Sequence, residues 1–122
     1  MAAHVPSAWA RLEAVRKARA VLGGDLEILE GCRSLASLAH DVVPDWSVDA
    51  DFVVVGAIAS EIDDLPLGSV RSQWSSTALA RADLEIKRYT EAAREDVLAA
   101  CRNIIERFGA PDANALGDEG AV

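Results

Sequence analysis

Hydrophobic residues recur at spacings of three and four along most of the chain, which is the period of an amphipathic helix. The first such pattern occupies residues 8–22, after Ser7 as a candidate N-cap, and Gly23-Gly24 ends it. The second follows Asp25, another candidate N-cap, and continues to residue 39. These two segments are predicted to be amphipathic helices.

A third apolar run, residues 51–62, fits two kinds of structure. Its β-branched FVVVGAIA core is typical of a buried strand, but Phe52, Val55 and Ile62 also keep a helical spacing. Asp49 or Asp51 can cap a helix at its start. Since no second strand-like run exists to pair with it, and a lone strand leaves its backbone groups unpaired, we predict a helix.

The longest pattern covers residues 76–108 and predicts a helix of about 50 Å. A helix of that length overhangs a domain of this size, so we expect it to bend near residues 88–90 or to extend into a second copy of the chain. Gly109 suits the position after its last turn. The fold class predicted is all-α: a four-helix single domain over residues 1–109, with a long C-terminal helix and a disordered acidic tail at 110–122.

The connection between the third and fourth segments reads SEIDDLPLGSVRSQW, residues 60–74. As a helix corner, it would be held to the core by its apolar side chains, Leu65, Leu67, Val70 and Trp74. Arg71 would then pair with Glu61, Asp63 or Asp64. The alternative is a binding site, because loops on rigid scaffolds often carry recognition and because Trp and Arg are frequent in interface hot spots.

The net charge of -8 is concentrated in the middle of the chain. Residues 25–68 contain ten acidic side chains and a single basic one, Arg33, whereas residues 1–24 are net basic. A nucleic-acid-binding protein shows the opposite sign over a contiguous face, so we expect no nucleic acid partner. The acidic region would instead attract a basic protein partner or divalent cations.

The cysteines, the hydropathy and the lack of a catalytic motif exclude further classes of function. Cys32 and Cys101 lie 69 positions apart within helical patterns, as expected of two buried apolar side chains. No apolar run reaches 18 residues, so no membrane span is expected, and the N-terminal segment lacks the features of a secretory signal. Cytoplasmic residence is the resulting expectation. A Ser-His-Asp set lacks the G-x-S-x-G turn that would support it.

Two acidic pairs give an alternative with enzymatic chemistry. Glu27 and Glu30 lie three apart on the second predicted helix, as do Glu61 and Asp64 at the end of the third, and each pair could ligate Mg²⁺. This arrangement resembles the metal site of all-helical nucleoside triphosphate pyrophosphatases of the MazG-like group. The gap between the pairs is longer than in that group, however, and Leu65-Pro66 follows the second pair.

Three blocks, LEGCRSLASLAHD (29–41), SEIDDLPLGSVRSQW (60–74) and LAACRNIIERFG (98–109), resemble a small bacterial domain family without an assigned activity. The resemblance implies a stand-alone bacterial domain and transfers no catalytic residues. Small acidic bacterial proteins are also similar in character to immunity proteins, which neutralise basic toxins.

Together these features predict a protein-binding module, immunity-like in character, rather than an enzyme; a structural homodimer through the long helix is a further alternative. The predicted recognition residues are Glu61, Asp63, Asp64, Arg71, Trp74 and His40, the last also able to cap the second helix. They belong to a wider acidic band with Glu27, Glu30, Asp41 and Asp45.

Overall fold

The computed structural model describes residues 6–109, so the predicted tail at 110–122 lies outside the described residues. The main elements are four α-helices: α1 (Ala8–Gly23), α2 (Ile28–Val42), α3 (Ala50–Glu61) and α4 (Ser76–Ile104). Three short helical segments complete the described chain: 3-10 turns η1 (Trp46–Val48) and η2 (Gly68–Gln73), and a π-helical turn η3 (Ile105–Gly109). Residues 6–109 contain no strand, which confirms the all-α prediction, but a count of four helices omits these short elements.

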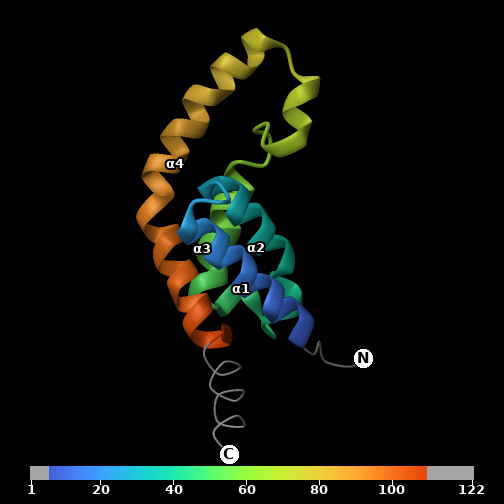
Figure 1. Ribbon diagram of the computed structural model, residues 1–122, viewed down its shortest axis with the longest axis vertical. Coiled ribbons are helices and arrows are strands. Elements are labelled where there is room, and N and C mark those ends of the chain that lie inside the picture. The colour runs from blue at the N-terminus through green and yellow to red at the C-terminus, as the bar shows by residue number, and fades with distance from the viewer. Residues whose placement is uncertain (1–5, 110–122) are drawn as a thin grey trace, which may run out of the picture.

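The helices are arranged as a bundle with one overhanging arm (Figure 1). α2 packs against both α1 and α3, and all three helices pack against the C-terminal half of α4. The N-terminal half of α4 continues beyond them, with η2 beside it, as the predicted length required. α4 is one continuous helix that curves gently, without a break at residues 88–90. Over residues 6–109, no helix has the length and apolar character needed to cross a bilayer.

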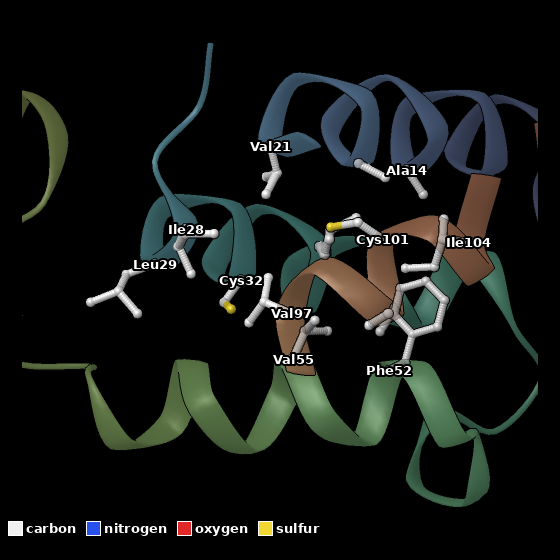
Figure 2. Close-up of a cluster of buried hydrophobic side chains, with 14 of the residues drawn as sticks. Ala14, Val21, Ile28, Leu29, Cys32, Phe52, Val55, Val97, Cys101 and Ile104 are labelled. Carbon is white, nitrogen blue, oxygen red and sulfur yellow. The ribbon is translucent and has the colours of Figure 1, made fainter. Parts of the chain in front are cut away.

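The core lies where the four α-helices meet. Figure 2 shows Phe52 and Val55 from α3 facing Val97 and Ile104 from α4, while Leu29 and other side chains of α2 close the same cluster. All five side chains are at most 1% exposed. The run at residues 51–62 is therefore a helix because its apolar face completes this core.

The helix starts show which caps the sequence identified correctly. Ser7 caps α1 by accepting a hydrogen bond from the N–H of Ala10, and Asp49 caps α3 through the N–H groups of Asp51 and Phe52. The prediction that Asp25 caps α2 was wrong. Its N–H donates to the carbonyl of Ala20, so it belongs to the turn that ends α1, and α2 begins at Ile28.

Small residues occupy the buried faces of α1 and α2. Ala10, Ala14 and Ala18 of α1 are fully buried, and Gly31 of α2 is buried against Val21. A Cβ atom built on Gly31 would overlap the Cγ2 methyl of Val21. Gly31 therefore sets the separation of the two helices at the start of α2.

Candidate functional site

Acidic residues from two helices lie at one end of the bundle. α2 and α3 are antiparallel neighbours, so the start of α2 lies beside the end of α3 (Figure 1). Arg33 of α2 fixes this arrangement, because its guanidinium donates to three carbonyl oxygens after the last turns of α3: Ile62, Asp63 and Leu65. We call this end, with Glu27, Glu30, Glu61, Asp63 and Asp64, the acidic end.

The charges that follow α3 are poorly placed for stability. Glu61, Asp63 and Asp64 are exposed at the C-terminal end of the helix, where the helix dipole disfavours negative charge. None of the three forms an ion pair with another described residue. Arg33 offsets part of this cost. Locally unfavourable residues that a fold retains are concentrated at functional sites.

Neutralising these acids should stabilise the fold. We expect Asp63→Asn with Asp64→Asn to raise the Tm by about 2 °C at low salt, since each charge opposes the helix dipole. The increase should vanish in 1 M salt, where charges are screened over about 3 Å. Thermal unfolding followed by circular dichroism measures it. Glu95→Gln, in the middle of α4, is the control, and an equal rise in that variant would contradict the dipole argument.

Arg71 does not pair with the acids predicted for it. Its guanidinium makes two hydrogen bonds to the Asp83 carboxylate, with N–O distances of 2.8 and 3.1 Å, and one to the carbonyl of Pro66 at 3.2 Å. The hydrogen bond from Arg71 lowers the pKa of Asp83. The prediction of an Arg71 pair with Glu61, Asp63 or Asp64 was therefore wrong. Arg71 ties η2 to the overhanging part of α4.

Two of the four apolar residues predicted to hold the connection face solvent instead. Leu65 is buried and Leu67 is half-buried, as expected. Val70 and Trp74 are 40% and 38% exposed, because η2 lies beside the arm of α4 rather than over the core. Trp74 is thus accessible to a partner.

The wider acidic band predicted from the sequence is divided in two. His40 and Asp41 lie at the opposite end of α2, about 15–20 Å from Glu30 and Glu27 at 1.5 Å per residue, and Asp45 follows that end. There Asp45 accepts hydrogen bonds from the hydroxyl and N–H of Ser47, which lower its pKa. The structure therefore does not bring His40 together with Glu61, Asp63 and Asp64.

The predicted magnesium ligands are not gathered into a metal site. Glu27, Glu30, Glu61 and Asp64 share one end of the bundle, but within residues 6–109 no three His, Cys, Asp or Glu side chains are grouped closely enough to hold a metal ion. α3 ends at Glu61, so Asp64 lies beyond the helix instead of on one helical face with Glu61.

The two cysteines are buried, as predicted. Cys32 of α2 and Cys101 of α4 are both in the core (Figure 2). Burial raises the pKa of Cys32 to about 12 and that of Cys101 to about 11. Both thiols therefore stay protonated at neutral pH and are weak nucleophiles.

Sequence reasoning missed a second charged cluster, at the other end of α4. Arg107 bonds both oxygens of Asp49 and one oxygen of Asp51, with N–O distances between 2.7 and 3.0 Å. Asn103 donates to the remaining oxygen of Asp51, which is only 7% exposed. These bonds join residues more than 50 positions apart, so no local pattern indicated them. The cluster links the start of α3 to the end of α4.

Comparisons with protein-family models, with curated proteins and with solved structures found no match to this chain. The resemblance of the three blocks to a bacterial domain family stays a prediction.

Proposed function

We propose that this protein is a small bacterial protein-binding module that recognises a basic partner through its acidic end. One observation carries the proposal. Glu61, Asp63 and Asp64 are exposed, have no ion pair among the described residues and stand at the end of a helix that disfavours them. A basic partner surface would place positive charges in ion pairs with these three carboxylates, which the described part of the fold does not do.

Nearby features suit a binding surface of this kind. Val70 of η2 and Trp74, directly after it, expose apolar area, and Arg71 is fixed by Asp83 rather than by the acids of the acidic end. Trp is frequent in interface hot spots, whereas exposed charges mainly speed association. The combination resembles an immunity protein in character. The proposed partner is a protein rather than nucleic acid or a membrane, and a cytoplasmic location is part of the proposal.

Charge reversal at the acidic end tests the proposal. Tagged protein is used to capture partners from lysate of its own organism at low and high salt, and the association rate of a captured partner is then measured. Asp63→Lys with Asp64→Lys should slow association at least about tenfold at low salt, because electrostatic steering would be lost. The difference should shrink as salt is raised.

A matched variant separates steering from net charge. Glu95→Lys with Glu106→Lys changes the net charge equally, at one exposed position of α4 and one of η3 outside the acidic end, and should slow association much less. Equal rates for wild type and the Asp63/Asp64 variant would contradict the proposal. Release of pyrophosphate from nucleoside triphosphates that depends on Mg²⁺ would favour the hydrolase alternative instead. The homodimer through α4 stays a prediction.

A further inference from the structure

A cavity of about 270 Å³ opens where the start of α2 faces η2 and the arm of α4. Three apolar side chains line it: Leu29 of α2, Leu67 before η2, and Ile86 of α4. Pockets for small-molecule ligands and cofactors usually measure about 300–1,000 Å³. The cavity lies just below this range, a size that suits a single amino-acid side chain.

Two carboxylates line the same cavity. Glu30 extends from α2 toward Gly68, and a Cβ built on Gly68 would lie 3.4 Å from its Oε2 atom. Gly68 has a φ of 70°, a conformation that favours glycine, so no side chain at position 68 crowds this carboxylate. Neither Glu30 nor Glu27 forms an ion pair with another described residue.

Arg71 also lines the cavity, but its charge is already compensated. Its hydrogen bonds go to Asp83 and Pro66. The pKa of Arg71 is raised first by the hydrogen bond to Asp83 and further by the nearby charge of Glu30. Because Arg71 and Asp83 cancel each other, the cavity keeps the negative charge of its two glutamates.

We propose that this cavity receives a basic side chain, lysine or arginine, of the protein partner. The aliphatic stem would lie against Leu29, Leu67 and Ile86, and the cationic group would reach Glu30 and Glu27. Long basic side chains bury their stems on apolar surface while their charged ends remain paired or hydrated. The inference rests on the proposed function and names how the partner would be anchored beside the acidic end.

Of the two glutamates, Glu30 is the one that lines this cavity alone. Glu27 and Thr90 also line a neighbouring cavity of about 330 Å³ that includes Arg94, so Glu27 is shared with a basic side chain. Glu30 lines the first cavity and not the second. Substitution of Glu30 therefore tests the proposed pocket with the least effect on its surroundings.

The experiment titrates the full chain with three small probes while amide NMR shifts are followed. The probes are the Nα-acetyl methylamides of lysine, arginine and norleucine, the last a neutral analogue with an aliphatic stem. We expect the basic probes to bind and to shift the amides of Leu29, Leu67 and Ile86. Norleucine should bind at least about tenfold more weakly, and Glu30→Gln should reduce binding of the basic probes by a similar factor.

Two further variants make the test specific. Glu95→Gln removes an exposed acid of α4 that does not line the cavity and should leave probe binding unchanged. Asp83→Asn removes the partner of Arg71, so the guanidinium can turn toward Glu30 and should weaken lysine binding without altering the lining. Three results would each contradict the proposal that the cavity receives a basic side chain: equal binding of the norleucine and lysine probes, no effect of Glu30→Gln, or no binding of any probe. Because these probes do not require the partner, such a result leaves the salt-dependent capture experiment to decide the proposed function separately.

Discussion

Arg107→Met should lower the free energy of unfolding by about 2–3 kcal/mol. The substitution leaves the buried carboxylate of Asp51 with Asn103 as its remaining side-chain partner and removes both bonds to Asp49. Breaking a fully buried ion pair by removing one partner costs about 3–5 kcal/mol. Because the Arg107 side chain is 37% exposed, water would replace part of what is lost, and we expect a smaller effect. Urea denaturation followed by circular dichroism measures it.

The same variant should change how stability depends on pH. Burial raises the pKa of Asp49, but hydrogen bonds from Arg107 and the N–H of Phe52 outweigh it, so the pKa lies below its ordinary value. A carboxyl group with a lowered pKa in the folded state stabilises fully above its ordinary pKa, about 4, and loses this contribution as pH falls through the folded-state value. Arg107→Met should therefore flatten the loss of stability below about pH 4.

Arg102→Met is the control, since it removes an exposed positive charge from the same part of α4. It should change the free energy of unfolding by no more than about 0.5 kcal/mol. If Arg107→Met is equally mild and keeps the acid dependence of wild type, the cluster does not hold α3 to α4.

The helices could be predicted from the sequence because their signals are local. The spacing of Phe52, Val55 and Ile62, together with the lack of a second strand-like run to pair with them, predicted α3 as a helix although its residues favour a strand. The ion pairs could not be predicted in this way. Arg71 had three acids nearer in the sequence than Asp83, and only the position of the α4 arm beside η2 decides between them.

The candidate site was also predictable only where its signals are local in the sequence. The acids at residues 25–68 were evident from composition, and antiparallel packing of α2 and α3 is expected for neighbouring helices with a short connection. That packing places the start of α2 beside the end of α3, where Arg33 bonds the carbonyl of Asp63, and moves Asp41 to the other end of the bundle. The cavity, by contrast, depends on where η2 lies relative to the start of α2 and the arm of α4, which no spacing of residues indicates.

Gly31→Ala should destabilise the protein by about 2 kcal/mol. At most helix positions this change is favourable by up to about 1 kcal/mol, because alanine has the higher helix propensity. Here the added methyl would overlap Cγ2 of Val21, which is 4% exposed and, being β-branched, is restricted at χ1. Overpacking of this kind typically costs about 1–3 kcal/mol. Thermal and urea unfolding measure the loss.

A second substitution separates this clash from any other effect of the methyl. Val21→Ala removes the overlapping group, so Gly31→Ala should cost at least about 1 kcal/mol less in a Val21→Ala background. Strict additivity of the two changes would show that α1 and α2 are not in contact through this pair. Because Gly31 follows Glu30, moving the start of α2 should also weaken lysine-probe binding, and the double variant should restore it. Recovery of stability and of probe binding together would connect the helix spacing to the proposed pocket.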